Sequence, residues 1–142
     1  FTLPQTGTYL IRISANNLVA TGGYNLGLEG IAPPTPDPTM IGCGDTSAGS
    51  ITTAGQSQLW RFDATASSVV TLTITETTDW GGSLGANDAR LTLFDPSGTQ
   101  IDEFDSNQQH ELTLPQTGTY LIRISANNLV ATGGYDLSLA CS

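Results

Sequence analysis

The sequence contains no lysine and little charge of either sign, since only 12% of its residues are charged. Four arginines face thirteen aspartates and glutamates, which gives a net charge of −9 at neutral pH. Phosphate backbones and anionic lipid surfaces repel a chain with this balance. The missing lysine also excludes Schiff-base chemistry and the Lys–Asn isopeptide bonds that reinforce some surface adhesins. We therefore expect no nucleic-acid partner.

Long apolar runs are absent as well. No stretch of about 18 apolar residues is present, so we expect no membrane insertion. The sequence has sixteen glycines and is 38% hydrophobic, without a convincing helical pattern. This composition predicts short strands joined by turns in a secreted protein. Phe1 lies inside a module rather than in a secretory leader, so we expect the chain to have been cut from a longer protein.

Histidine occurs once, at His110. A Ser-His-Asp triad would need this residue, and no Gly-x-Ser-x-Gly motif supplies a nucleophile. The segment Asp45-Thr46-Ser47 weakly resembles an aspartic-protease loop, but such a site needs two apposed carboxylates, and the motif has no second copy. We therefore predict no catalytic residues and no enzyme activity. His110 is expected to be a solvated residue at a strand edge.

One stretch of 23 residues occurs twice without a change: TLPQTGTYLIRISANNLVATGGY spans residues 2–24 and again 113–135. The copies are 111 positions apart (113 minus 2), a length that suits one domain. Both contain LPQTG, the pattern of a sortase signal. A strand follows it instead of an apolar span and a basic tail, so we interpret it as a turn into that strand.

The repeat predicts the domain organisation. We expect residues 1–30 to be the C-terminal strands of an incomplete preceding module, 31–40 to be a linker and 41–142 to be a complete module. The linker has four prolines between Pro33 and Pro38. Such a run favours extended polyproline geometry at about 3 Å per residue, which makes a semi-rigid spacer.

Side chains alternate along the repeated stretch. From Thr119 to Ala126, the apolar Tyr120, Ile122 and Ile124 take every second position. A period of two is typical of a strand with one buried face. The same pattern in the first copy lacks its partner strands, so we predict assembly with other polypeptide, with packing on its own module as the competing outcome. The predicted assembly residues are Tyr9, Ile11, Ile13, Tyr24, Leu26 and Leu28.

The two cysteines, Cys43 and Cys141, lie near the two ends of the complete module. A disulfide between them would tie the first and last strands together and suits a secreted protein. Two buried free thiols are the alternative. The bond would close a loop of 97 residues (44 through 140), which stabilises a fold by about 4 to 5 kcal/mol. Gly30 occupies the equivalent position of the first copy, so we expect the preceding module to lack this bond.

The complete module shows a series of short alternating segments separated by turn residues. Seven to nine short strands at this spacing predict an all-β fold, an antiparallel two-sheet sandwich of jelly-roll type without significant helix. Residues 95–98, Asp-Pro-Ser-Gly, have the composition of a type I turn. The expected strands are 50–52, 58–64, 69–75, 90–94, 100–104, 111–114, 119–126 and 135–141.

Four motifs of this module form a set: Trp60-Arg61-Phe62, LFDPSG at 93–98, Gly118-Thr119-Tyr120 followed by Arg123-Ile124, and GYDLSL at 134–139. Together they resemble the bacterial pre-peptidase C-terminal domain over about 44–139, and residues 2–28 are similar to the last third of another copy. The resemblance implies a jelly-roll-like sandwich on secreted bacterial proteins, often beside peptidases, some of which bind calcium or fibrous substrates. It implies no catalytic residues.

Two features are candidate ligand sites. Asp102, Glu103, Asp105 and Asn107 form the densest acidic cluster, and their oxygens could hold a calcium ion. A plain polar hairpin end explains the cluster too, because it lacks the glycine-punctuated spacing of a dedicated calcium loop. We expect no other cofactor. Trp80 could stack on a sugar ring or could instead cap one end of the core.

Two functions of different classes follow. The repeat favours a non-catalytic structural module of an extracellular or cell-surface bacterial protein, a fibre, filament or surface-layer segment. Such modules would assemble with other copies of themselves or with neighbouring modules by strand complementation. The alternative is a substrate-binding accessory domain of a secreted hydrolase or peptidase. It would bind polysaccharide or protein through Trp80, Tyr24 or Tyr135.

Overall fold

The structure, a computed structural model, describes residues 13, 22–23, 38–81 and 88–142. These residues form nine strands and no helix, so none of them belongs to a helix that could cross a bilayer. Most of the predicted linker and five predicted assembly residues, Tyr9, Ile11, Tyr24, Leu26 and Leu28, lie outside the described residues. The strands are β1 (Thr39–Met40), β2 (Asp45–Ile51), β3 (Ser57–Ala64), β4 (Val69–Glu76), β5 (Ala89–Phe94), β6 (Gln100–Asp105), β7 (Gln108–Thr113), β8 (Gly118–Ala126) and β9 (Gly133–Cys141).

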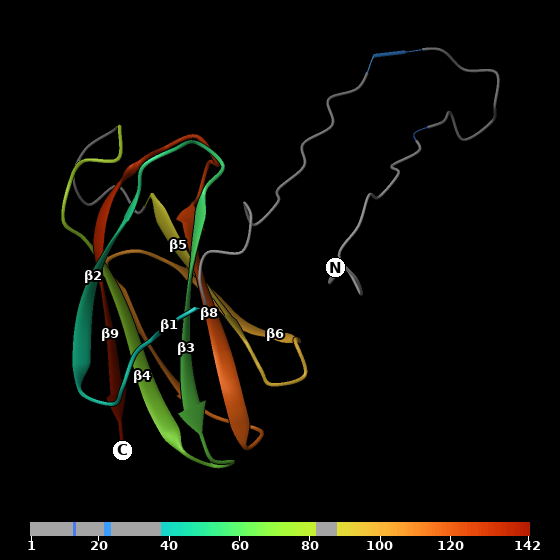
Figure 1. The fold of residues 1–142 in the computed structure, drawn as a ribbon, viewed down its shortest axis with the longest axis vertical. Coiled ribbons are helices and arrows are strands. Elements are labelled where there is room, and N and C mark those ends of the chain that lie inside the picture. Colours follow the sequence, from blue (N-terminus) through green and yellow to red (C-terminus); the bar gives the residue numbers. More distant parts are fainter. Residues whose placement is uncertain (1–12, 14–21, 24–37, 82–87) are drawn as a thin grey trace.

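The strands form two packed sheets. Sheet A has five strands in the order β1-β3-β8-β5-β6, and sheet B has four in the order β2-β9-β4-β7. Every pairing is antiparallel except that of β1 with β3. In Figure 1, β2, β9 and β4 lie on the left of the sandwich, and β3, β8 and β6 lie on the right. The predicted all-β, two-sheet sandwich is confirmed.

The repeated stretch supplies β8 of sheet A and the first three residues of β9 of sheet B. Its residues 118–126 form β8, which pairs with β3 on one side and β5 on the other. The chain then crosses to sheet B, where β9 pairs with β2 and β4. The 23 residues that the sequence repeats therefore connect the two sheets.

The alternation in β8 and β9 fills the space between the sheets. Tyr120, Ile122 and Ile124 are fully buried, as is Tyr135. Fully burying a large apolar side chain contributes roughly 1.5 to 3 kcal/mol, so these strands contribute much of the stability of the core. The remaining large, fully buried side chains include Ile41, Ile51, Leu72, Ile74, Trp80, Leu91, Leu93 and Leu114.

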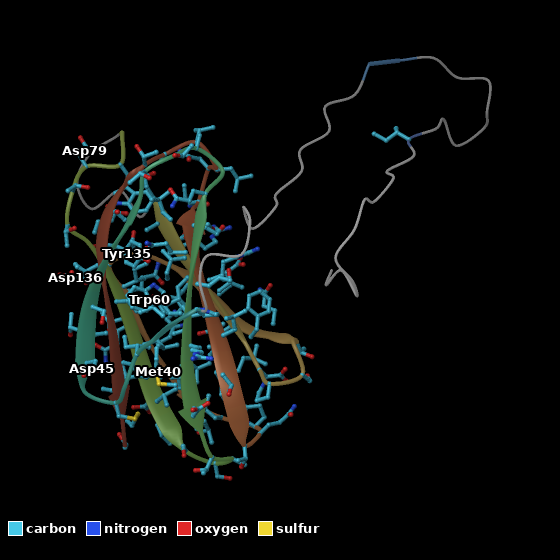
Figure 2. The ribbon with its side chains drawn as sticks, viewed as in Figure 1. Met40, Asp45, Trp60, Asp79, Tyr135 and Asp136 are labelled. Atoms are coloured by element: carbon cyan, nitrogen blue, oxygen red, sulfur yellow. A yellow bond between two sulfur atoms is a disulfide. The ribbon has the colours of Figure 1, made fainter. Side chains whose placement is uncertain are left out.

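A small polar cluster lies inside this core. The Trp60 indole N–H donates to the Tyr135 hydroxyl at 2.8 Å, and that hydroxyl donates to Gln58 Oε1. Figure 2 shows Trp60 and Tyr135 in the middle of the sandwich. Burial raises the pKa of Tyr135 far above its usual value, so the hydroxyl stays protonated and keeps its donor role. Each polar group of the cluster is therefore satisfied.

The strands differ from the sequence prediction at β1, β2 and β7. β2 begins at Asp45 instead of residue 50, because its residues pair with β9 along seven positions. The sequence did not indicate this longer strand, since its residues show no alternation of apolar side chains. β7 spans Gln108–Thr113 instead of 111–114. Thr39 and Met40, placed in the linker by the sequence prediction, form the short β1 beside β3.

The first prediction concerns Gly49. It lies opposite Tyr135 in the β2–β9 pairing, and a Cβ added to it would lie 2.4 Å from Tyr135 Cζ. We expect Gly49→Ala to lower the free energy of unfolding by about 1 to 3 kcal/mol through overpacking. Urea denaturation measures the change. Ser50→Ala, on the solvent face of the same strand, is the control and should stay within about 0.5 kcal/mol of the parent. Equal stability of the two variants would contradict the close contact.

Candidate functional site

The cysteines mark one end of the sandwich. Cys43 and Cys141 form a disulfide with a Cα–Cα distance of 5.4 Å, and no free cysteine exists among the described residues. The bond ties the turn before β2 to the end of β9, so the predicted disulfide is confirmed. A hollow of about 510 Å³ lies beside it, and Asp63 is the only ionisable side chain among the described residues that line it. This hollow therefore offers no constellation for acid–base or nucleophilic chemistry.

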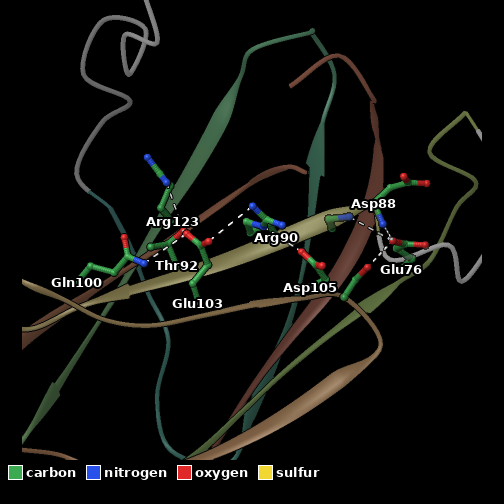
Figure 3. A network of polar contacts seen from close by, with 10 residues as sticks. Glu76, Asp88, Arg90, Thr92, Gln100, Glu103, Asp105 and Arg123 are labelled. Atoms are coloured by element: carbon green, nitrogen blue, oxygen red, sulfur yellow. Dashed lines mark hydrogen bonds and ion pairs between the residues drawn. The ribbon is translucent and has the colours of Figure 1, made fainter. Parts of the chain in front are cut away.

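The structure disperses the acidic residues that were considered as calcium ligands. Successive side chains of β6 point to opposite faces, so Asp102 is separated from Glu103 and Asp105. Asp105 Oδ1 lies 2.9 Å from Arg90 Nε, and Glu103 Oε1 lies 3.6 Å from Arg90 Nη1. Figure 3 shows Arg90 between these two carboxylates. The hydrogen bond with Asp105 raises the pKa of the Arg90 guanidinium.

The other members of the cluster also have structural partners. Asp102 lies 2.9 Å from His110 Nδ1, and Asn107, at φ 61° in the β6–β7 turn, accepts a hydrogen bond from the Glu76 amide. Within the described ranges, no group of three or more His, Cys, Asp or Glu side chains is arranged to hold a metal. The four residues that were weighed as calcium ligands are therefore not brought together as one site, and the alternative of a polar hairpin end describes their arrangement better.

His110 bridges the two sheets at one edge. It lies on β7, the edge strand of sheet B, and its ring stacks on Phe104 of β6 with a centroid distance of 4.0 Å. Its side chain is 35% exposed. The expected position at a strand edge is correct, but the ring is held by Phe104 and Asp102 rather than simply solvated. This contact links the outermost strands of the two sheets.

Trp80 caps the opposite end from the disulfide. It is 2% exposed, and its indole N–H donates to the Gly134 carbonyl at 3.0 Å. A Cβ added to Gly133 would lie 2.4 Å from the indole ring, so the ring packs directly on this glycine. A buried ring has no free face for a sugar, and the geometry favours the capping interpretation over the sugar-binding one.

The LPQTG segment at 114–118 forms a turn that joins three parts of the chain. Leu114 is buried, and the Tyr120 hydroxyl donates to the Gln116 carbonyl at 2.7 Å and accepts from the Gln116 amide at 3.1 Å. The Gln116 side chain donates to Asp95 Oδ2 at 3.0 Å. The pentapeptide therefore has a structural role in this module, as expected for a turn into a strand.

Asp95 organises the turn that faces this segment. Its Oδ1 accepts hydrogen bonds from the Ser97 hydroxyl at 2.6 Å and from the Ser97 and Thr99 amides at 2.9 Å each. These bonds, that of the Ser97 hydroxyl first, hold the pKa of the Asp95 carboxyl below its usual value, against the opposing effect of desolvation. The sequence predicted the turn but not its contact with Gln116.

The two repeat copies differ in their surroundings. Gly133 and Gly134 lie so close to Trp80 and Thr77 that an added Cβ would come within 2.4 and 2.7 Å of them. The equivalent first-copy residues, Gly22 and Gly23, have nothing within 4 Å of an added Cβ. Ile13 is 44% exposed, whereas its counterpart Ile124 is fully buried. The described part of the first copy thus lacks the contacts that its second-copy counterparts make.

The outer face of sheet A gathers every arginine that the structure describes. We call it the arginine face and define it by the outward residues Leu59, Arg61, Arg90, Thr92, Phe94, Leu121 and Arg123, assigned by strand alternation and register. Sequence reasoning did not identify it, although Arg61 and Arg123 alternate with core residues of their strands. This alternation indicates that both arginines point away from the core, but only the pairing of β3 with β8 shows that the two side chains lie near each other.

Comparison with known proteins agrees with this architecture. The family described as "Bacterial pre-peptidase C-terminal domain" matches residues 56–126, which is 71 of the 142 residues. No curated relative matches the chain significantly.

Three solved structures share the fold. PliG of Aeromonas hydrophila, a periplasmic inhibitor of g-type lysozyme, is 21% identical with a TM-score of 0.57, covering 73% of this chain and 95% of its own. The pre-peptidase C-terminal domain of Bacillus anthracis collagenase is 14% identical with a TM-score of 0.56, covering 71% and 92%. The Yersinia pseudotuberculosis-derived mitogen is 17% identical with a TM-score of 0.54, covering 70% and 86%.

The disulfide gives a second prediction. Replacing both Cys43 and Cys141 with serine should lower the free energy of unfolding by about 4 kcal/mol, because the unfolded chain loses its closed loop. Urea denaturation of the variant and of the reduced parent measures this loss. The parent should also resist alkylation until a reductant is added. Two thiols that react without reductant would contradict the bond.

Asp95 gives a third prediction, on pH. Since its folded pKa is lowered, its stabilising contribution is fully present above its unfolded-chain pKa of about 4 and is lost as the pH falls through the folded value. The parent should therefore be more stable than Asp95→Asn at pH 7, and the difference should shrink below about pH 4. Asp136→Asn, on the outer face of sheet B, is the control. A difference that stays constant from pH 7 to pH 3 would disprove this role.

Proposed function

Because the chain belongs to the bacterial pre-peptidase C-terminal domain family, we propose that it is a non-catalytic accessory module that works outside the cytoplasm. Its disulfide suits an oxidising compartment. The proposal goes further: the module is one unit of a tandem array, a fibre, filament or surface-layer segment. In this array, residues 1–30 complete a second module of the same kind, and the proline-rich residues 31–38, which precede β1, space the two.

The described residues of the first copy carry this proposal. The paired glycines of the second copy are needed because Trp80 and Thr77 press against them. The first copy also has glycines at these positions, Gly22 and Gly23, although no described residue lies within 4 Å of a Cβ added to either of them. We therefore infer that a partner packs against Gly22 and Gly23 in the way that Trp80 and Thr77 pack against the glycines of the second copy.

The turn residues support the same conclusion. In the second copy, Leu114, Gln116 and Tyr120 hold β8 in its module. An offset of 111 positions places Leu3, Gln5 and Tyr9 at the equivalent points of the first copy. Residues 2–24 can therefore occupy the position of β8 and the start of β9 in another module, either in a continuous chain or in a neighbouring subunit, by strand complementation.

The energetics favour such a partner. The first copy repeats the inward side chains of β8 and β9, and each contributes roughly 1.5 to 3 kcal/mol when fully buried. Left in water, six of them forgo on the order of 10 kcal/mol. The exposure of Ile13 is consistent with this cost. The equivalent strands of the chain's own module are already present at 118–141, so that module offers no vacant place.

A second function, the binding of a protein substrate as an accessory domain, is favoured by one observation. Arg61 and Arg123 are half-buried on the arginine face, and neither forms an ion pair within the part of the chain that the structure describes. The two functions are compatible, because an array of modules presents the same face many times.

The array proposal gives a fourth prediction. The 142-residue chain should form oligomers in light scattering, and Tyr9→Asp with Ile11→Asp should dissociate them, because both side chains belong to the inward face. Thr8→Asp is the matched control, since its counterpart Thr119 is exposed, and it should leave the oligomers intact. Amide exchange should show protection of residues 9–13 in the oligomer only. A compact monomer with these amides protected would refute strand complementation.

A further inference from the structure

We propose that the arginine face binds an extended acidic peptide segment of a protein partner, with Arg61 and Arg123 as the two carboxylate-binding residues. The inference rests on the second function proposed for the module and names its ligand. Three observations carry it: the state of the three arginines, the spacing of two of them, and the kind of side chains between them.

The arginines of this face are not in the same state. Arg90 is already neutralised by Asp105 and Glu103. The Arg61 side chain makes no ion pair or hydrogen bond in the described part of the chain. Its Nε is buried without a partner. Two of the three described arginines, Arg61 and Arg123, therefore lack a carboxylate partner in a chain with thirteen acidic residues.

Arg123 is only partly engaged. Its Nη2 donates to the Thr92 hydroxyl at 3.3 Å, and its guanidinium lies 5.8 Å from the centre of the Phe94 ring. Its Nε, like that of Arg61, is buried without a partner. Burying a charged donor without an acceptor costs free energy, and because the Nε atoms are buried, a ligand carboxylate would offset this cost by pairing with the terminal Nη nitrogens in charge-assisted bonds.

The strand register sets the spacing of the two sites. Arg61 lies opposite Leu121 and Leu59 lies opposite Arg123, so the two arginines are diagonal neighbours on adjacent strands. Such neighbours are about 7 to 8 Å apart. Side chains at i and i+2 of an extended peptide are about 6.6 to 6.8 Å apart on one face. Two acidic residues in that relation can therefore each reach one arginine.

The residues between the arginines favour a peptide over a polysaccharide. Leu59, Leu121 and Phe94 are half-buried and point outward with the arginines. Arginine and aromatic residues are enriched in protein–protein interfaces, where lysine is depleted. Sugar rings dock on open aromatic faces, but Phe94 already carries the Arg123 guanidinium and its neighbours are aliphatic. A segment that alternates acidic and apolar residues matches both parts of the face.

The fifth prediction is the binding experiment. The probe is an acetylated and amidated Glu-Leu-Glu-Leu-Glu-Leu peptide, titrated into the 142-residue chain and followed by NMR shifts of Leu59, Arg61, Leu121 and Arg123. We expect Arg61→Gln and Arg123→Gln each to weaken binding about tenfold, by loss of a charge-assisted bond. Gln109→Glu, an exposed position on β7 of sheet B, is the matched control, since it lowers the net charge by one unit as the two arginine variants do, and it should change affinity less than twofold.

Each alternative outcome has a clear meaning. A lack of binding up to millimolar peptide, an equal loss in Gln109→Glu, or equal affinity for a Gln-Leu peptide would overturn the proposed site. Polygalacturonate that binds the same residues more tightly would also overturn it and would assign the face to an anionic polysaccharide. Ligand binding at other residues would keep the accessory function while refuting this site. Light scattering of the same variants tests the array independently, since none of these residues belongs to the first copy.

Discussion

Both sheets depend on the backbone pairing of β8 and β9, each of which lies between two neighbours. Removing β8 would leave β3 and β5 without a shared strand, and removing β9 would separate β2 from β4. Two contacts hold these strands at the points where they begin. The Tyr120–Gln116 hydrogen bonds lie at the start of β8, and Trp80 packs on Gly133 at the start of β9. A single continuous segment therefore determines whether the sandwich closes.

The polar groups of this segment stabilise the packing of the two sheets against each other. Gln116 connects the β7–β8 turn to Asp95. Tyr135 of β9 forms hydrogen bonds across the core with Trp60 and Gln58, which both lie on β3. Buried polar groups that all have partners favour one packing arrangement over others. The acidic residues follow the same rule, since those of β6 are engaged by Arg90 and His110. Among the described residues, the buried side-chain polar atoms without a partner lie outside the core and are the Nε atoms of Arg61 and Arg123.

Period-two alternation made the fold predictable from sequence, because β3, β4, β8 and β9 each bury one face. β2 was predicted too short, since Asp45 to Ser50 carry small or polar side chains and are held by backbone pairing that no hydropathy pattern records. The disulfide could be predicted from two cysteines near the module ends. The dispersal of the predicted calcium residues could not be foreseen, because it depends on Arg90 and His110 from other strands, and the arginine face depends on register.

The disulfide has a mechanical consequence for a chain that works under tension. A pulling force applied through the segment before Cys43 and the segment after Cys141 would pass along the covalent bond and bypass the strands between them. The enclosed sandwich would then be shielded from load and would not lengthen. The first copy has Gly30 in place of the second cysteine and would lack this bypass. Bonded and unbonded modules in one filament would yield at different forces, which makes the unbonded ones the extensible elements.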